Sequence, residues 1–489
     1  MDRRQLLAAG GSLFALTGCA NMGMDMGGGS TAGLSPEALA RDAEIARAVL
    51  PQQTPRAELL QKWTGPYEGV PPWPSVTADK LKVAIVEGIE LQRAEVNAIA
   101  DNPEPPTFAN TMVAMQMAGE PLGRALSLFG VMSSNIGSAD YQAVQREVSP
   151  LLSAAGDETT FNAKLFARIK AVADGARAAG LTPEQTRIAE RSRDSFTRNG
   201  AALDAAGKAE LGRINSALSS AFTRFGQAVV ADENTWTVLT DESQTAGLPA
   251  SNKAAAAAAA RDRNLEGWAI VNTRSSVDPY LSFADDRAMR EVVWRKFVNR
   301  GDNGNANDTN ATIAEIVKLR AERARLLGYA HHAEWRMQDT MAKTPEAAMD
   351  LMMRVWEPAK ARVTEEVADM RAIAGHDIEP WDYLYYAEKV RKQKYDLDQN
   401  ELKPYFELNA VKRGAFYMAE RLYGYTFTPV PAGSVPVFHP DVEVFEVKDK
   451  ASGRHIGLFY SDDFARPGKR SGAWMTSYRL GWAYDGGGN

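Results

Sequence analysis

Helical periodicity extends over most of the chain and limits its fold more than any other feature of the sequence. Between residues 77 and 100, large apolar side chains recur at helical spacing, with Lys, Glu and Arg between them. The stripe consists of Leu81, Ile85, Ile89, Val96 and Ile99. Ser35-Pro36-Glu37 and Thr344-Pro345-Glu346 have the composition of helix starts, with a capping hydroxyl, Pro in the first turn and an acid. These patterns predict a mainly α-helical fold.

Further helices are expected in the second half of the chain. Seven consecutive alanines within residues 253–261 favour a helix, because Ala has the highest helix propensity. Residues 411–422 and 312–329 are also helical in pattern, and the latter helix is expected to stop at Gly328. Its predicted core residues are Ile313, Ile316, Val317, Leu319 and Leu326. Residues 268–280 are predicted to be a connecting segment with a short extended piece.

The aromatic residues between positions 381 and 406 form another helical stripe. Their members at helical spacing are Trp381, Tyr385, Tyr386 and Tyr395. Aromatic side chains on such a stripe belong to a packed core more often than to a ligand platform. The sequence therefore favours a core role for them, with a binding role as the alternative.

One stretch departs from the helical pattern, between residues 436 and 474. Residues 442–444 and 456–460 are β-prone, and a polar segment that ends in Gly joins them at residues 448–453. This arrangement predicts an antiparallel hairpin. The adjacent pair Asp462-Asp463 is interpreted as a solvated turn, because neighbouring side chains in an extended segment face opposite ways.

A cationic, Gly-rich loop follows the hairpin and contains Arg466, Lys469, Arg470, Gly472 and Trp474. Its cations suit the wall of a peptide channel, because Arg and Lys bind carboxylates through charge-assisted hydrogen bonds. A solvated loop has the same composition. The residues by themselves favour neither interpretation.

Composition excludes several classes of protein. The 489 residues allow two or three domains. The net charge is 56 − 62 = −6, without a long basic block, which does not support nucleic-acid binding. No apolar run is long enough to span a bilayer. We expect a monomer that contacts a membrane through an N-terminal anchor, and the family resemblance described below implies short peptides as its further partners.

The N-terminal 33 residues have the layout of an exported lipoprotein. Arginines at positions 3–4 precede a short apolar region, and residues 16–19, Leu-Thr-Gly-Cys, resemble the bacterial lipoprotein box. The chain's single cysteine, Cys19, is the predicted lipidation site. Residues 1–19 are the expected signal peptide and 20–33 a flexible tether. The paired arginines also resemble a twin-arginine signal. We expect a periplasm-facing anchor, in the outer membrane because the residue after Cys19 is not Asp.

The residues alone assign no catalytic or metal site. A zinc peptidase helix carries H-E-x-x-H, which is absent here, and none of the five histidines has a partner at that spacing. His331 and His332 are adjacent and are expected to be solvated near a helix start. There is no G-x-S-x-G motif, and the only thiol lies in the predicted signal.

Four segments, in order, resemble the thimet oligopeptidase family of zinc metallopeptidases, in particular its bacterial peptidyl-dipeptidase branch. They are residues 102–111, 312–342, 381–406 and 437–474. The resemblance implies a two-lobed helical body with a deep channel for short peptides and a β-hairpin near the cleft. It also implies zinc chemistry that removes dipeptides from peptide C-termini. In the family the zinc helix and a further Glu ligand follow the Gly-Ala-Trp segment, so no ligand can be transferred to this sequence.

The resemblance suggests an organisation in two domains. Residues 34–250 would form an N-terminal helical domain and 251–489 a partial catalytic domain without the zinc helix. The last ten residues, 480–489, do not resemble the family. We expect a C-terminally truncated peptidase that is inactive by itself and exposes apolar surface. The alternative is a non-catalytic, lipid-anchored peptide-binding or scaffold protein.

Overall fold

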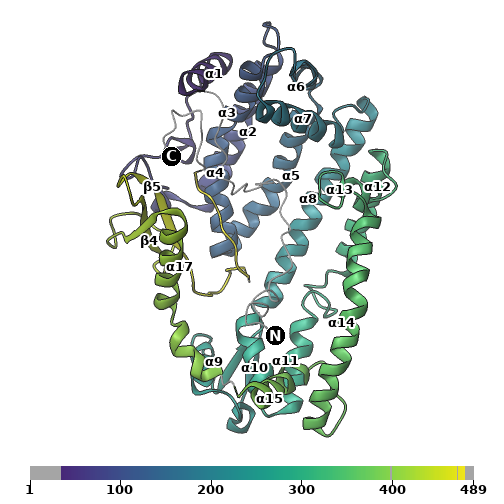
Figure 1. Ribbon diagram of the computed structural model, residues 1–489, viewed down its shortest axis with the longest axis vertical. Coiled ribbons are helices and arrows are strands. Elements are labelled where there is room, and N and C mark those ends of the chain that lie inside the picture. Colours follow the sequence, from purple (N-terminus) through teal and green to yellow (C-terminus); the bar gives the residue numbers. More distant parts are fainter. Residues whose placement is uncertain (1–34, 397–398, 471, 480–489) are drawn as a thin grey trace.

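The computed structural model describes residues 35–396, 399–470 and 472–479 and confirms the mainly helical fold (Figure 1). Cys19, the predicted signal peptide and the tether lie outside these residues. The first half of the chain forms a series of helices. They are α1 (Pro36–Val49), η1 (Glu58–Leu60), η2 (Trp73–Ser75), α2 (Ala78–Ala100), the π-helix η3 (Phe108–Val113), α3 (Ala114–Met117), α4 (Glu120–Val131), the π-helix η4 (Met132–Ile136), α5 (Ala139–Phe161), α6 (Ala163–Gly175), α7 (Pro183–Arg198) and α8 (Ala205–Glu233).

The second half adds further helices and two small sheets. The helices are η5 (Glu242–Thr245), α9 (Ala250–Arg261), α10 (Arg274–Phe283), α11 (Arg287–Val298), α12 (Asn310–Leu326), α13 (His332–Met337), α14 (Pro345–Ala374), α15 (Tyr383–Tyr395), α16 (Gln399–Leu402), η6 (Lys403–Phe406) and α17 (Leu408–Tyr423). The strands are β1 (Trp236–Leu239), β2 (Trp268–Val271), β3 (Tyr425–Pro429), β4 (Glu443–Asp449) and β5 (His455–Ser461). Within the described ranges, no helix combines the length and the apolar character that a bilayer span requires.

The predicted helix starts are confirmed by their caps. The Ser35 hydroxyl accepts a hydrogen bond from the backbone N–H of Ala38, and the Thr344 hydroxyl accepts one from the N–H of Ala347. Such a cap satisfies one of the donors that every helix leaves unpaired in its first turn. Gly375 ends α14 in the left-handed conformation, with φ of 72°.

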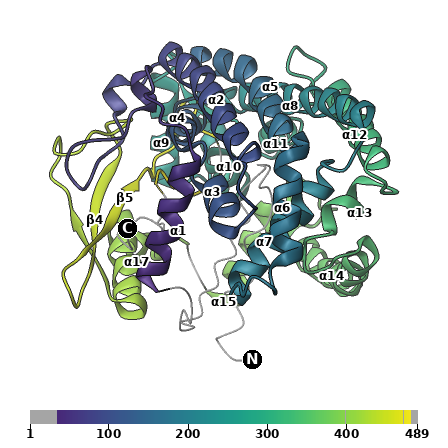
Figure 2. The ribbon, with the colours of Figure 1, turned by 90° about the horizontal axis from the view of Figure 1, so that it is seen from above.

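A row of helices carries the main cores. Each packs against the next in the order α4, α2, α5, α8 and α12, and Figure 2 shows them side by side. All five apolar residues predicted for the face of α2 are buried, so that prediction is confirmed. Leu81, Ile85 and Ile89 belong to a core with α4 and α5, whereas Val96 and Ile99 belong to a second core with η3 and α6. Helix α2 therefore connects two cores.

The predicted hairpin is confirmed and is part of a larger sheet. Strands β4 and β5 pair antiparallel, and β3 pairs with the other edge of β4, giving the order β3-β4-β5. Helix α17 covers this sheet through Phe416, whose ring lies 4.2 Å from that of Phe427 and 4.9 Å from that of Phe445. The sheet also reaches the N-terminal region, where Tyr67 stacks on His455. The sequence analysis did not predict β3.

Three predictions of local structure were wrong. Of the connecting segment predicted at residues 268–280, the short extended piece is confirmed as β2, but residues 274–283 form α10, because burial of Val277, Tyr280 and Leu281 outweighs the helix-disfavouring Pro279. On α12, the predicted core residues Ile313 and Val317 are 42% and 59% exposed, because only the face containing Ile316 and Leu319 meets α8. At the end of α15, Tyr395 is 69% exposed and is not a core residue.

Two helices leave large apolar side chains uncovered. Of the residues of α14, only Met370 is buried, and of the residues of α17, none is. Figure 1 shows α14 along one side of the molecule and α17 along the other. The exposed apolar residues are Met349, Leu351, Met352, Met353, Val355, Trp356, Val363 and Ile373 on α14 and Val411, Tyr417, Met418, Leu422 and Tyr423 on α17. Exposed apolar side chains that are contiguous on a surface often mark a contact with another protein segment.

Candidate functional site

The segment after β5 is fixed to the N-terminal helices by the carboxylate of Asp462. Arg466 binds both of its oxygens, with each Nη–O distance 2.7 Å. The side-chain amide of Asn135, at the end of η4, donates to Oδ2 at 2.6 Å, and Lys469 Nζ lies 3.1 Å from Oδ1. The carboxylate therefore accepts from three side chains, one of which lies 327 positions earlier in the chain.

This carboxylate is held in its charged form. The side chains of Asp462, Arg466 and Lys469 are each about 10% exposed. Burial raises the pKa of Asp462, but hydrogen bonds from Arg466, Asn135 and Lys469 outweigh burial and lower its pKa to about 2. The prediction that Asp462 lies in a solvated turn was wrong. Its neighbour Asp463 has the same side chain, and only the tertiary partners distinguish the two.

Two glycines allow the backbone of η4 to touch the backbone of the cationic loop at residues 466–474. Gly137 and Gly468 have φ of 56° and 81°, in the left-handed region that favours glycine. A Cβ on Gly468 would collide with the carbonyl oxygen of Ile136, and a Cβ on Gly137 would collide with that of Gly468. The N–H of Arg470 donates to the carbonyl of Ser134 at 2.9 Å. The loop is therefore held by backbone contact as well as by charge.

The structure divides the predicted channel residues into two groups. Arg466 Nε donates to the carbonyl of Asn135, and Lys469 Nζ donates to the carbonyls of Asp462 and Phe464. The interpretation as a solvated loop is therefore wrong for Arg466 and Lys469. The other group is exposed and contains Arg470, Gly472 with φ of 115°, and Trp474, which is 41% exposed. Contact between any of the five and a substrate stays a prediction.

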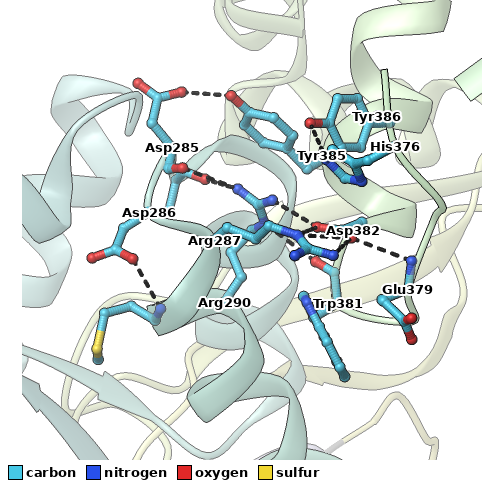
Figure 3. A network of polar contacts seen from close by, with 12 residues as sticks. Asp285, Asp286, Arg287, Arg290, His376, Glu379, Trp381, Asp382, Tyr385 and Tyr386 are labelled. Carbon is cyan, nitrogen blue, oxygen red and sulfur yellow. Dashed lines mark hydrogen bonds and ion pairs between the residues drawn. The ribbon is translucent and has the colours of Figure 1, made fainter. Parts of the chain in front are cut away.

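A second buried ion pair joins α11 to the start of α15 (Figure 3). Asp382 is fully buried, and its two oxygens lie 2.7 Å from Arg287 Nη2 and 2.9 Å from Arg290 Nη2. Arg290 is 1% exposed and also donates to the carbonyls of Ala284 and Trp381. Burial raises the pKa of Asp382, but hydrogen bonds from both arginines keep it below its ordinary value. This carboxylate is a structural clamp and not a proton acceptor.

Tyr385 extends the clamp toward the surface. Its hydroxyl donates to Asp285 Oδ1 at 2.8 Å, and the Arg290 guanidinium lies 4.0 Å from the centre of its ring. Burial and the hydrogen bond to Asp285 raise the pKa of Tyr385 to about 12. Figure 3 shows His376 and Tyr386 beside it. The phenol stays protonated at neutral pH, which suits a positioning role for this aromatic group rather than acid–base chemistry.

The described residues do not offer a zinc site. Within them, no group of three or more His, Cys, Asp or Glu side chains comes close enough to hold a metal ion. Zinc in proteins takes three or four such ligands. His331 is exposed and accepts from the N–H of Glu334, as expected at a helix start. The prediction of a solvated position was wrong for His332, whose half-buried ring has a buried Nδ1 atom.

Comparison with known proteins identifies the family. Residues 281–484 match the model of Peptidase family M3. The match places residues 281–484 in peptidase family M3. This confirms the resemblance to the thimet oligopeptidase family. The boundary predicted at residue 250 stays a prediction, and the match lies wholly within the predicted second domain.

Individual relatives cover most of this chain. It is 37% identical over 427 residues to the dipeptidyl carboxypeptidase of Escherichia coli, a match that includes 86% of this chain and 62% of that protein. It is 35% identical over 428 residues to the dipeptidyl carboxypeptidase of Salmonella typhimurium, with the same two shares. Oligopeptidase A of Escherichia coli is 29% identical over 420 residues, which are 84% of this chain and 61% of that protein. The chain therefore spans less than two thirds of the length of these relatives.

The contact between the two glycine backbones can be tested with a matched pair of substitutions. Gly468→Ala and Gly433→Ala both place an L side chain at a φ of 81°, a strain of roughly 1–2 kcal/mol. A Cβ added at Gly433 would meet nothing within 4 Å, whereas one at Gly468 would meet the Ile136 carbonyl. We expect Gly468→Ala to lower the free energy of unfolding by at least about 1 kcal/mol more than Gly433→Ala does. Urea unfolding followed by tryptophan fluorescence measures both, and equal losses would contradict the close approach.

The charge of Asp462 is expected to stabilise the fold in a pH-dependent way. Asp462→Asn should cost about 3 kcal/mol at pH 7, because it leaves Arg466 and Lys469 buried without their counter-charge. Asp441→Asn, at a carboxylate that is 45% exposed, is the control and should have a much smaller effect.

The pH dependence follows from the lowered pKa of Asp462. A carboxylate whose folded pKa is about 2, against an ordinary value near 3.9, contributes its full stabilisation above about pH 4 and loses it as the pH falls toward 2. The difference in unfolding free energy between the wild type and Asp462→Asn should therefore shrink from pH 5 to pH 2.5. A difference that stays constant over this range would refute the assignment.

Proposed function

We propose that this chain forms the greater part of a zinc metallopeptidase that acts on short peptides and releases dipeptides from their C-termini. The observation that carries the proposal is the 37% identity to a dipeptidyl carboxypeptidase over 86% of this chain. The family match to Peptidase family M3 supports the same class of reaction. The share of the relatives that this chain spans, 62% or less for those described above, makes the activity of the whole protein a proposal.

In this proposal the zinc ligands come from outside the described residues, which hold no suitable group. A bound zinc would supply a polarised water as the nucleophile. The described residues would instead bind and orient the peptide. Arg470 and Trp474 remain exposed beside the segment that Asp462 anchors, so they offer a cation for a peptide carboxylate and an aromatic surface.

The uncovered faces of α14 and α17 support the proposal that a further protein segment completes the fold. A helix of 30 residues with one buried side chain gains little from tertiary packing, although packing provides most helix stability in proteins. We propose that the part of the relatives' length that is not matched here, more than one third, supplies the cover for these faces. The 489-residue chain alone would then lack hydrolytic activity and would associate through exposed apolar side chains.

The alternative is a non-catalytic peptide-binding or scaffold protein. It predicts a stable monomer that binds peptides without turnover. The same anchored loop would serve it, because Arg470 and Trp474 would bind peptide without a zinc centre beside them. Turnover by a completed protein, together with the association state of the chain alone, distinguishes the two proposals.

The activity test compares the 489-residue chain with a completed protein. We expect the pure chain to show no release of dipeptides from a blocked pentapeptide, with or without added zinc. A fusion that continues this chain with the C-terminal part of the Escherichia coli dipeptidyl carboxypeptidase should release dipeptides, and 1,10-phenanthroline should abolish the release. Chelator-sensitive activity of the chain alone would refute its predicted inactivity.

The same fusion tests the exposed loop. Arg470→Ala should lower kcat/KM by about tenfold, mainly through KM, if its guanidinium binds a substrate carboxylate. Arg454→Ala, an exposed arginine in the β4–β5 turn, is the matched control and should leave kcat/KM within about twofold. Equal effects of the two substitutions on kcat/KM would contradict the proposal that Arg470 binds the substrate.

We propose in addition that the protein is exported and anchored to a membrane by a lipid on Cys19. The arrangement of arginines, apolar segment and Leu-Thr-Gly-Cys supports this proposal, as does the absence of any other thiol from the sequence. The tether at residues 20–33 would separate the anchor from α1. The expected location is the periplasmic face of a bacterial membrane, with the outer membrane favoured.

Lipidation can be measured directly. Cells that express the full chain in the presence of radiolabelled palmitate should incorporate label into the protein, and the protein should fractionate with membranes. Cys19→Ser should abolish the incorporation and delay cleavage of the signal, because the thiol is the site of acylation. Thr17→Ser, a conservative change two positions away, is the control and should retain the label. Labelling of the Cys19→Ser protein would disprove the anchor.

A further inference from the structure

Helices α12 and α13 bring four basic side chains together at a junction with α8, on the side of the molecule where α14 begins (Figures 1 and 2). Arg320 and Arg323 are three positions apart on α12, and His332 and Arg336 are four apart on α13, so each pair lies on one helix face. Trp335 lies between the two pairs. Its ring centre is 4.4 Å from the guanidinium carbon of Arg323 and 5.5 Å from that of Arg336.

Each of the four basic side chains lies beside an aromatic ring, either that of Trp335 or that of Phe222. The His332 ring lies 5.5 Å from that of Trp335, and the guanidinium of Arg320 lies 5.1 Å from the Phe222 ring. Stacking on an aromatic face orients a guanidinium and leaves its hydrogen-bond donors at the edge. The Nε atoms of Arg320 and Arg323 and the Nδ1 atom of His332 are buried without a hydrogen-bond partner among the described residues. The cluster is therefore short of acceptors.

The junction also lacks negative charge. Among the residues that the structure describes, Arg320, Arg323 and Arg336 take part in no ion pair with a carboxylate. Glu322 and Asp339, on the same two segments, lie nearer to other cations, at 3.6 Å from Arg213 and 2.5 Å from Arg191.

The carboxylate that faces the cluster is Asp157 of α5. It is connected through Asn215, which donates to Asp157 at 2.8 Å and accepts from Arg323 at 3.4 Å. Burial raises the pKa of Asp157 to about 6, and its second oxygen has no partner within the described part of the chain. Asp157 therefore reaches only Arg323, and only through Asn215.

Burial and the neighbouring positive charges both shift the pKa values of the cluster. Burial, together with the charges of Arg320 and Arg336, lowers the pKa of Arg323 to about 10. Burial and the three arginines lower the pKa of His332 to about 4, so its ring is neutral at pH 7. A neutral imidazole can donate one hydrogen bond to an anion without adding to the repulsion. Three cations and a neutral donor make a favourable place for an anion.

We propose that Arg320, Arg323, Arg336 and His332 form a binding site for a small oxyanion. Guanidinium groups bind phosphate and carboxylate oxygens with paired hydrogen bonds, which a ring-stacked arginine can offer from its edge. Arg336 is exposed and Arg320, Arg323 and His332 are half-buried, so an anion can approach the cluster from solvent, and it would meet the Nη atoms of the arginines, because the Nε atoms of Arg320 and Arg323 are buried. The oxyanion is either a free ion or a carboxylate of a protein segment, and both offer the same acceptor chemistry.

Calorimetric titration with inorganic phosphate at constant ionic strength tests the site on the 489-residue chain. We expect saturable binding that Arg323→Met weakens by about tenfold or more, because a charged hydrogen-bonding partner is lost. Arg325→Met, at an exposed arginine of the same helix outside the cluster, is the matched control and should leave phosphate binding within about twofold. Weakening by Arg325→Met as large as that by Arg323→Met, or no saturable binding by the wild type, would overturn the proposal.

Two further comparisons separate binding from folding and distinguish the sources of the anion. His332→Gln should weaken phosphate binding and His331→Gln should not, and circular dichroism verifies that both variants are folded. Acetate in place of phosphate tests carboxylate recognition. If the chain binds phosphate and the completed fusion does not, a protein carboxylate occupies the site. If both bind it, the ligand is a free ion.

Discussion

The carboxylate of Asp462 is the interaction on which the placement of the C-terminal segment depends. Burying a charge is costly unless donors replace the water that it loses. Arg466, Lys469 and Asn135 provide that replacement, and Asn135 belongs to a helix 327 positions earlier. Because these donors must meet two oxygens at once, they specify one position of the segment against η4. Apolar contacts of the neighbouring sheet tolerate small displacements, whereas this cluster does not.

The glycine contact explains how such a polar cluster can form at all. The Asn135 amide reaches Asp462 only if the backbone of the loop lies directly on η4, and a Cβ at Gly137 or Gly468 would prevent that approach. Tyr478, farther along the same segment, then packs on Trp73 and Tyr460. Charge, backbone contact and aromatic packing thus fix the same segment from different directions. Between these contacts, Arg470 and Trp474 keep their side chains in solvent.

Local signals in the sequence predicted the elements but not their partners. Capping residues such as Ser35 and Thr344 determine helix starts through hydrogen bonds to residues a few positions away, and these predictions were confirmed. The hairpin could also be predicted, because its strands and its turn are adjacent in the sequence. The partners of Asp462 could not be predicted, because Asp462 and Asp463 are identical in type and the tertiary fold alone gives Asp462 the Asn135 amide and Asp463 the ammonium of Lys412. Ile313 and Val317 were predicted to be buried and are exposed, because an apolar residue is buried only if a neighbouring element covers its face.

Helices α12 to α14 carry two kinds of side chain that lack partners in the described part of the chain, namely exposed apolar residues and arginines without a carboxylate. The two kinds need different partners. The exposed apolar residues of α14 gain free energy from any segment that excludes water. The arginines of α12 and α13 gain from an acceptor of negative charge in a defined place, and an apolar cover would increase their desolvation. One protein segment can satisfy both only if it carries a carboxylate opposite Arg323 and apolar side chains opposite Trp356. If a free anion binds at the junction, the segment that covers α14 needs no carboxylate opposite Arg323. Helix α13 would then lie between an ion-binding site and a protein interface.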